Sequence, residues 1–331
     1  MNAPQRILFA IKDPDARRHA TIDKVARLAK TLGARLDLFN AISAPVFLEL
    51  QPLTGDSLGA LRRESLALRT KQLEKLAARA RRHGVETTVA VEWDFPPHEA
   101  IVRRAKKTGA DLIVAECHKG RRRAPWLIRL TDWEMLRASP VPVLLLKNSR
   151  AWRKPTVLAA VDPSHAHAKP ARLDESIVET ALALARKTDG DLELMHANYP
   201  SLLSIPSGDP AMDAAALQLQ FEERQRIGRR EFQKFSDAHR LPKSRRHVYE
   251  GHPAIGIPRV ARQRKADVVV MGAVSRSAIK RVFIGNTAER VLEALACDVL
   301  VVKTPHTEKA VARQPRGMRI VSQPPVLSLP V

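Results

Sequence analysis

Aromatic side chains are scarce in this sequence of 331 residues, where Phe, Trp and Tyr together make up 4%. A hydrophobic fraction of 44% nevertheless excludes a wholly disordered chain, so the core must be built from Leu, Ile, Val and Ala. No run approaches the roughly 20 apolar residues that a membrane-spanning helix needs, and we expect no membrane association. The chain has room for two domains, each with its own core.

Cysteine is equally scarce. Cys117 and Cys297 lie far apart in the sequence and do not suggest a disulfide framework. The first residues of the chain lack the basic segment, the long apolar run and the small-residue cleavage site of a secretory signal. These observations together predict a protein of the reducing cytoplasm.

Acidic residues are few compared with basic ones, and the net charge is +21, divided into +12 for residues 1–150 and +9 for residues 151–331. Such a charge attracts polyanions at low salt through counterion release. The sequence has no recognition helix, zinc finger or aromatic-rich single-strand motif to accompany it. We therefore expect no specific nucleic-acid binding, and we interpret the charge as general surface basicity.

Common catalytic and metal-binding motifs are also missing. The sequence contains neither a G-x-S-x-G elbow nor a G-x-x-x-x-G-K-[ST] phosphate loop. Cys117 and His118 are adjacent, and adjacent side chains on a strand point in opposite directions, so they do not form a nucleophile–base pair. Four histidines near predicted strands lack the grouping of a zinc site: His165, His167, His247 and His252. We predict no catalytic residue and no metal ion.

The chain contains an internal repeat. ADLIVAECHKG, which begins at Ala110, matches ADVVVMGAVSR, which begins at Ala266, and VPVLLLK ending at Lys147 matches CDVLVVK ending at Lys303. Both matches have a constant offset of 156 residues. Three further pairs keep the same offset: Pro97 and Pro253, Ile101 and Ile257, and Ala105 and Ala261. Shared residue types in one register indicate a duplication.

Short apolar runs alternate with amphipathic stretches in the second half. Strands are predicted over 156–161, 191–197, 245–251, 267–272 and 298–303, with helices over 173–190, 211–240, 253–265 and 286–296. This β-α order predicts an α/β fold with a five-stranded parallel sheet in the order 3-2-1-4-5 and helices on both faces. We expect two such flavodoxin-like domains, at 1–150 and 151–304, followed by a disordered tail over 305–331 that is rich in Pro and Gly.

Ligands of open parallel sheets bind beyond the carboxyl ends of the strands, where the strand order reverses. In the second half this point lies between the first and fourth strands, next to Asp162 and to the loop GAVSRSAIKRVFIGNTAE that begins at Gly272. Glycines allow close approach of backbone amides to phosphate oxygens, and a helix that begins after Gly285 adds N–H donors.

This loop resembles the nucleotide-binding loop of the universal stress protein family, which has Gly, two residues, Gly, nine residues, then Gly followed by Ser or Thr. Gly272 and Gly285 match the first and third glycines, and VDPS at 161–164 resembles the first-strand signature of the family. The tandem arrangement and the sequence GNTAERVL are most similar to the E-type subgroup. The resemblance covers about 1–148 and 154–304, and it implies two adenine-nucleotide-hydrolase-like domains that pair through their last strands.

The resemblance also implies site residues. Asp162 would accept a hydrogen bond from adenine or ribose, and Ala197 would line the base. Ser275 replaces the middle glycine of the family pattern, and Asn286 stands where the family has Ser or Thr, with Thr287 one place later. Asn286 can still donate to a phosphate. Asn286 and Glu289 also have capping-box spacing, which leaves a purely structural role open.

The first half departs further from the pattern. Lys12 matches Asp162, Glu116 matches Gly272, and Lys119 and Arg129 match Ser275 and Gly285. A carboxylate at 116 would repel phosphate, so we expect packing and partner recognition here instead of nucleotide binding. Thr131 and Glu134 have capping-box spacing and predict the start of a helix.

Three functions remain open at this point. The first is a cytoplasmic stress-response protein that binds ATP, AMP or ADP with Mg²⁺ in its second domain and acts by regulation, with at most slow ATP hydrolysis. The second is a binding module or scaffold for another small ligand, such as an acyl compound or a nucleotide sugar. The third and least favoured is a nucleic-acid-associated basic protein. The expected assembly is a monomeric tandem pseudo-dimer or a homodimer.

Overall fold

A computed structural model describes residues 4–15, 20–47, 55–117, 125–164, 172–200, 210–272, 286–303 and 311–321. The chain folds into two compact units. The N-terminal unit contains Pro4–Val141, Ser149–Ala151 and Glu308–Val331, and the C-terminal unit contains Pro142–Asn148 and Trp152–Thr307.

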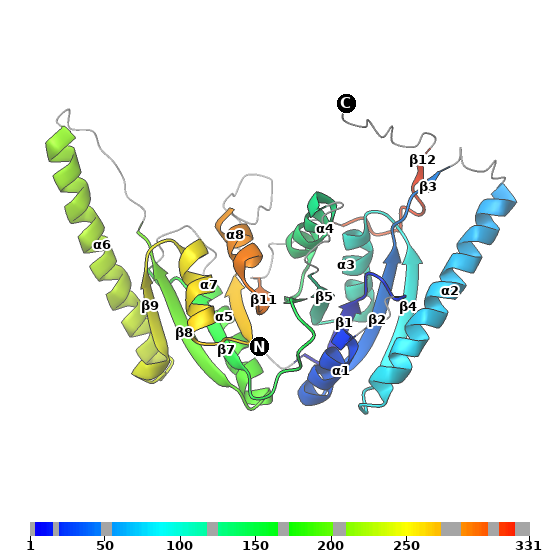
Figure 1. The fold of residues 1–331 in the computed structure, drawn as a ribbon, viewed down its shortest axis with the longest axis horizontal. Helices are drawn as coiled ribbons and strands as arrows, with labels where there is room; N and C mark the ends of the chain where they lie inside the picture. Colours follow the sequence, from blue (N-terminus) through cyan, green and yellow to red (C-terminus); the bar gives the residue numbers. More distant parts are fainter. Residues whose placement is uncertain are drawn as a thin grey trace. The chain divides into compact units, whose positions relative to one another are not determined.

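The N-terminal unit is a parallel sheet covered by helices on both faces (Figure 1). Its strands run in the order β4-β2-β1-β5, and every neighbouring pair for which the register is known is parallel. Helices α1 and α2 pack together, as do α3 and α4. The elements are β1 (Arg6–Ala10), α1 (Ala20–Leu32), β2 (Arg35–Ile42), β3 (Val46–Phe47), α2 (Gly55–Arg81), β4 (Thr87–Trp93), α3 (Pro97–Thr108), β5 (Leu112–Glu116), α4 (Pro125–Ala138) and β12 (Ile320–Val321).

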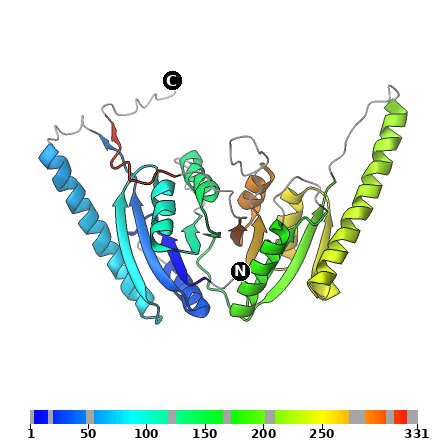
Figure 2. The same cartoon turned by 180° about the vertical axis from the view of Figure 1, so that it is seen from behind.

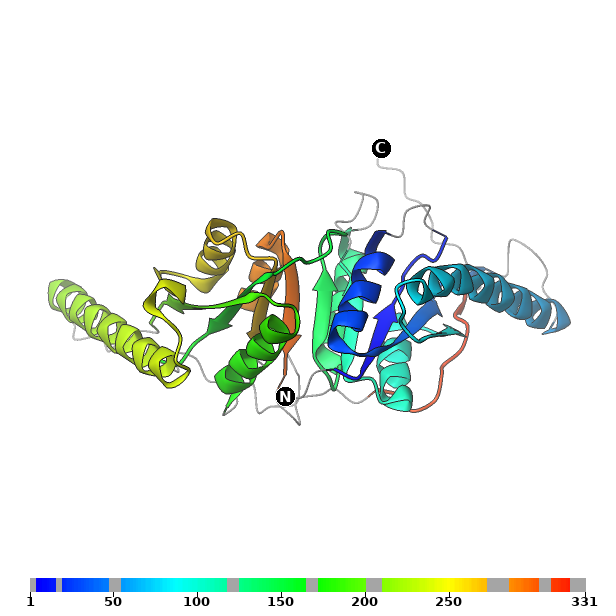
Figure 3. The ribbon, with the colours of Figure 1, turned by 90° about the horizontal axis from the view of Figure 1, so that it is seen from below.

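The C-terminal unit repeats this plan. Its parallel strands run in the order β9-β8-β7-β10-β11, which is the predicted 3-2-1-4-5. Figure 3 shows α5 and α7 on opposite faces of this sheet, and Figure 2 shows α5 from its own side. The elements are β6 (Val143–Leu146), β7 (Thr156–Val161), α5 (Leu173–Lys187), β8 (Asp191–Asn198), α6 (Pro210–Ala238), a 3-10 turn (Lys243–Arg245), β9 (Arg246–Glu250), α7 (Pro253–Gln263), β10 (Val268–Gly272), α8 (Asn286–Ala294) and β11 (Asp298–Val302).

Strand β6 comes from the first repeat but belongs to the C-terminal unit. It pairs antiparallel with β11, with Leu144 opposite Leu300. The carboxylate of Asp298, which is fully buried at the start of β11, accepts hydrogen bonds from the backbone N–H of Lys147 at 2.9 Å and from the indole N–H of Trp152 at 2.9 Å. The last strands of the two repeats therefore pair within one chain, as the resemblance predicts.

Apolar strands and one-sided helices explain why these segments fold as they do. The residues of β1 from Ile7 to Phe9 are at most 1% exposed, because both faces of the parallel sheet are covered. In α1 the most deeply buried residues recur at helical spacing: Ile22, Val25, Ala26 and Ala29. The α/β fold class predicted from the sequence is thus confirmed.

Each repeat also holds a buried carboxylate on its second strand, β2 or β8. This carboxylate pairs with an arginine that lies in the third helix of the repeat or just after it. Asp37 of β2 binds Arg104 through contacts of 2.8 and 2.9 Å, and Glu193 of β8 binds Arg264 through two contacts of 2.8 Å. His247 contributes a further contact of 2.8 Å to Glu193. Burial alone would raise the pKa of Glu193, but the hydrogen bonds from Arg264 and His247 outweigh it and lower the pKa.

Two expectations from the sequence need correction. Helix α4 begins at Pro125, six residues before Thr131, so Thr131 lies inside the helix and does not cap it. Proline is well suited to the first turn of a helix, where its missing N–H has no partner to lose. Residues 311–321 of the predicted disordered tail lie along the N-terminal unit, where β12 pairs with β3. Residues 304–310 and 322–331 lie outside the described part of the chain.

Candidate functional site

The carboxyl ends of β7, β8 and β10 meet at one edge of the C-terminal sheet. Strand β7 lies between β10 and β8 and is parallel to both, with Val161 opposite His196. The chain leaves β7 towards β8 on one side and returns to β10 on the other, so the strand order reverses at this edge. This is the position at which open parallel sheets bind ligands.

Asp162, the first residue after β7, is held by groups from two elements. Its backbone N–H donates to Oδ1 of Asp174, in the first turn of α5, at 3.1 Å. Its own Oδ1 accepts a hydrogen bond of 2.7 Å from the hydroxyl of Ser164. The side chain remains 28% exposed. The carboxylate is therefore oriented by the protein and still accessible to a hydrogen-bond donor from outside.

His196 lies directly beneath Asp162. Its ring is 1% exposed and stacks on Phe232 of α6, with the ring centroids 5.7 Å apart. Nδ1 is 3.1 Å from the carbonyl oxygen of Val161 and 3.8 Å from Oδ1 of Asp162. Because a carbonyl can only accept, this contact places the proton on Nδ1. Nε2 has no hydrogen-bond partner among the described residues.

A second buried polar side chain lies at the same edge of the sheet and links it to α6. Asn198, at the end of β8, is 2% exposed, and its amide Nδ2 donates to the carbonyl of Gln225 at 3.0 Å and to Glu250 at 2.8 Å. Glu250 also accepts a hydrogen bond of 2.6 Å from Arg229 of α6. These contacts attach α6 to the ends of β8 and β9.

Gly272 has a packing role that is visible in the structure. A Cβ at this position would lie 2.7 Å from Cδ2 of Leu173 at the start of α5. Leu173 is 2% exposed, so it has little room to move away. The absence of a side chain at 272 therefore allows α5 to pack on the end of β10, whatever the loop beyond it binds.

The structure brings only some of the predicted site residues together. Asp162, Ala197 and Gly272 lie at the same edge of the sheet, and Ala197 is half-buried opposite Tyr249. Helix α8 begins at Asn286, and Thr287, its second residue, is half-buried. Ser275, Gly285 and the side chain of Asn286 lie outside the described part of the chain.

The corresponding edge of the N-terminal unit has different chemistry. Asn40 stands at the position of His196, and its Nδ2 donates to the carbonyls of Ile11 and Lys12 at 2.8 and 3.2 Å. Glu116, which matches Gly272, accepts a hydrogen bond from the hydroxyl of Thr21. Lys12 is exposed. Lys12 and Glu116 thus place an ammonium and a carboxylate at the positions where the C-terminal unit has the carboxylate of Asp162 and Gly272.

Sequence reasoning missed His196 and Asp174. A signal for His196 was available, because the offset of 156 aligns it with Asn40 and both are polar residues near the carboxyl end of a strand. No comparable signal marks Asp174, which resembles any acidic residue in a first helical turn. Within the described ranges, no group of three or more His, Cys, Asp or Glu residues could hold a metal ion. The helices in these ranges are also too short or too polar to cross a membrane.

Comparison with known proteins decides the family. The sequence model of the universal stress protein family matches residues 4–147 and again residues 156–303. The chain belongs to the universal stress protein family. Its two family domains follow each other in tandem and together span nearly all of the described chain.

Curated relatives and solved structures match this chain over most of its length. Universal stress protein E of Escherichia coli K12 is 27% identical over 301 residues, which cover 89% of this chain and 93% of the relative. Universal stress protein E of Photorhabdus laumondii is 24% identical over 303 residues, covering 89% and 94%. The crystal structure of a Pseudomonas aeruginosa PAO1 protein of unknown function has a TM-score of 0.66 at 24% identity and covers 92% of this chain and 95% of that one. A universal stress protein of Archaeoglobus fulgidus has a TM-score of 0.60 at 16% identity, with coverages of 93% and 98%.

Proposed function

We propose that the C-terminal unit binds an adenine nucleotide at the carboxyl edge of its sheet, and that the protein acts in a cytoplasmic stress response by regulation and not by catalysis. The observation that supports this most is the state of Asp162. Its carboxylate is fixed by Ser164 and by the contact of its backbone with Asp174, yet it is 28% exposed. It is thus preorganised to accept from the amino group of a base or from a ribose hydroxyl.

The phosphates would lie towards the amino terminus of α8. The first N–H groups of a helix have no partner within the helix and attract anions. Thr287 is placed in this first turn and offers a hydroxyl. Mg²⁺ would arrive with the nucleotide and neutralise part of the phosphate charge. Of the carboxylates described at the strand ends, Asp162 is the one that we propose to contact the nucleotide. We assign no general base to the site.

The N-terminal unit would not bind nucleotide in the same way. Glu116 occupies the position of Gly272 and would oppose phosphate, while Lys12 replaces the acceptor at 162. We therefore expect one nucleotide per chain.

Isothermal titration of ATP–Mg²⁺ at physiological salt tests this proposal, because salt suppresses diffuse attraction to the basic surface. We expect saturation near one site per chain and a loss of roughly 10-fold or more in affinity for Asp162→Asn, since an amide cannot replace a charged acceptor of this kind. The matched control is Lys12→Asp in the other unit, which should leave the affinity unchanged.

Absence of heat at millimolar ATP would refute nucleotide binding. The second candidate, a pocket for another small ligand, is favoured by the departures at Ser275 and Asn286 from the family loop. It predicts a molecule that copurifies with the protein and is detected by mass spectrometry after denaturation.

A further inference from the structure

Residues 311–321, here called the strap, form an extended segment on the surface of the N-terminal unit. Strap residues Ile320 and Val321 pair in parallel with Val46 and Phe47, and the N–H of Val46 donates to the carbonyl of Arg319 at 2.9 Å. Figure 1 shows this pair, β12 and β3, beyond the ends of β2 and β4. The strap thus adds its own backbone to an open strand edge, as peptide ligands do in β-augmentation.

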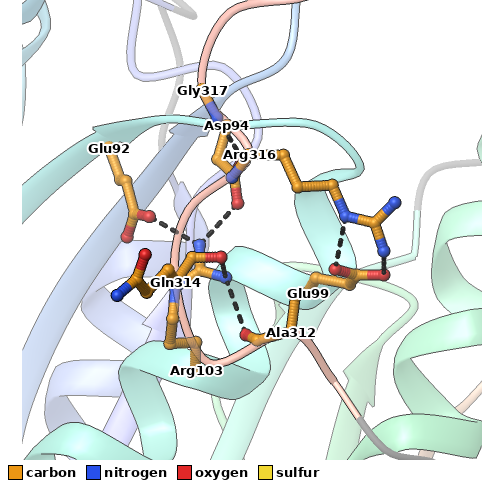
Figure 4. Close-up of polar contacts among 8 residues, drawn as sticks. All are labelled: Glu92, Asp94, Glu99, Arg103, Ala312, Gln314, Arg316 and Gly317. Carbon is orange, nitrogen blue, oxygen red and sulfur yellow. Dashed lines mark hydrogen bonds and ion pairs between the residues drawn. The ribbon is translucent and has the colours of Figure 1, made fainter.

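Asp94 recognises the backbone of the strap (Figure 4). This residue follows β4 and is fully buried. Its Oδ1 accepts hydrogen bonds from two successive backbone N–H groups, those of Arg316 at 2.7 Å and Gly317 at 3.0 Å. Gly317 has φ of +82°, a left-handed conformation that glycine adopts without the cost that a side chain adds. The site therefore selects a glycine after the arginine.

Glu99 recognises the arginine itself. Its two carboxylate oxygens lie 3.1 Å from Nε and 2.7 Å from Nη2 of Arg316, which is the bidentate geometry specific to guanidinium. A second arginine of the strap, Arg319, lies over the ring of Phe95, 5.0 Å from its centroid. The contacts together define the pattern Arg-Gly-x-Arg, which this chain carries at 316–319.

Arg103 holds the acidic side chains in place. Its Nη2 binds both Glu92 and Asp94, while Nη1 approaches the carbonyls of Ala312 at 3.3 Å and Gln314 at 3.5 Å (Figure 4). Burial alone would lower the pKa of Arg103, but the hydrogen bonds to Asp94 and Glu92 raise it, so the guanidinium stays charged. The groups that receive the strap are therefore fixed within the N-terminal unit.

The strap itself is only lightly attached. Of its eleven residues none is buried, and the side chain of Arg316 remains 59% exposed. Segments with few buried apolar contacts open at low free-energy cost. Opening would leave the buried carboxylate of Asp94 without two of its donors, which favours rebinding of a ligand with the same chemistry. The site is thus built to exchange its occupant.

We propose that Glu92, Asp94, Glu99 and the edge of β3 form a peptide-binding site for an extended Arg-Gly-x-Arg segment, and that the strap is its tethered ligand. A second peptide of this chemistry binds there only when the strap is released. The tether gives the strap an effective concentration in the millimolar range, so the resting protein keeps its site covered. The site is acidic and selects such cationic segments, although the net charge of the whole chain is +21.

The test uses the full chain and a fluorescent peptide of residues 311–321, with binding measured by anisotropy at physiological salt. The double variant Arg316→Glu/Arg319→Glu should release the strap and bind the peptide at least 10-fold more tightly than the unaltered protein. The matched control, Arg259→Glu/Arg262→Glu, makes the same charge change on exposed positions of α7 and should bind like the unaltered protein. Adding Glu99→Gln to the double variant should weaken binding about 10-fold, because the bidentate contact is lost.

Hydrogen exchange at the amides of residues 316 and 317 checks the release directly. Both amides should be protected in the unaltered protein and exchange freely in the double variant. The proposal fails if they stay protected in the double variant, since its arginines are then not what holds the strap. It also fails if the freed site binds a scrambled peptide of the same composition as tightly as the matched one, or if it binds neither.

Discussion

Gly228 of α6 offers a sharp test of how the helix packs on β8. A Cβ at this position would lie 2.3 Å from Oδ1 of Asn198 and 3.5 Å from Nε2 of His196. Asn198 cannot turn away without breaking its contacts with the carbonyl of Gln225 and with Glu250. Helix propensity alone predicts that Gly228→Ala stabilises the protein by about 1 kcal/mol.

The close contact reverses this sign. Either α6 moves outward, at an overpacking cost of about 1–3 kcal/mol, or the buried amide of Asn198 loses its partners at about 1–3 kcal/mol per group. After subtraction of the roughly 1 kcal/mol gained in propensity, we expect Gly228→Ala to lower the free energy of unfolding of the C-terminal unit by up to about 2 kcal/mol.

The control is the helical glycine Gly59 of α2. There the nearest atom to an added Cβ is Nη1 of Arg63 at 3.4 Å, the end of a flexible side chain. Gly59→Ala should therefore stabilise the N-terminal unit by about 0.5–1 kcal/mol. Urea denaturation followed by far-UV circular dichroism and calorimetry, fitted with a transition for each unit, measures both. Equal stabilisation by the two substitutions would refute the packing described for α6.

Two further predictions concern ionisable groups of the C-terminal unit. Because the pKa of Glu193 is lowered in the folded state, its ion pair stabilises the unit above the unfolded value of 4.5 and is lost as the pH falls through the folded pKa. Glu193→Gln should lower the free energy of unfolding by about 1–3 kcal/mol at pH 7 and flatten this acid dependence. Denaturation at pH 7 and at pH 3 measures both effects. The prediction is contradicted if the variant and the unaltered protein lose equal stability between these two pH values. Burial, with a contribution from Asp298, raises the pKa of Cys297 to about 11, so roughly one thiol in a thousand is ionised at pH 8. Iodoacetamide should alkylate Cys297 at pH 8 roughly 100-fold more slowly in the folded protein than in urea, as followed by peptide mass spectrometry, and equal rates would show that the thiol is not protected.

Part of the candidate site was predictable from the sequence. Asp162 and Gly272 each follow an apolar run that ends in a turn, and parallel strands place their carboxyl ends at one edge. The reason for Gly272 was not predictable. The assignment of Gly272 to phosphate contact stays a prediction, and the structure adds a packing reason: the missing side chain makes room for Leu173, a residue 99 positions earlier whose helix packs on the strand end.

The sequence by itself determined the duplication, the α/β class and the strand order of the second repeat. Buried parallel strands and one-sided helices impose local patterns of apolar residues, and these patterns are visible without any knowledge of distant contacts.

Only the tertiary structure decided the rest. His196 is recognised as part of the site only when β7 and β8 lie side by side, because its partner is a carbonyl 35 residues away. The strap lies in the tail over 305–331 that is rich in proline and glycine, so the composition of this tail predicts disorder. The strap is ordered because Asp94, 222 residues earlier, supplies the acceptor for its backbone, and no local pattern records a hydrogen bond over that separation.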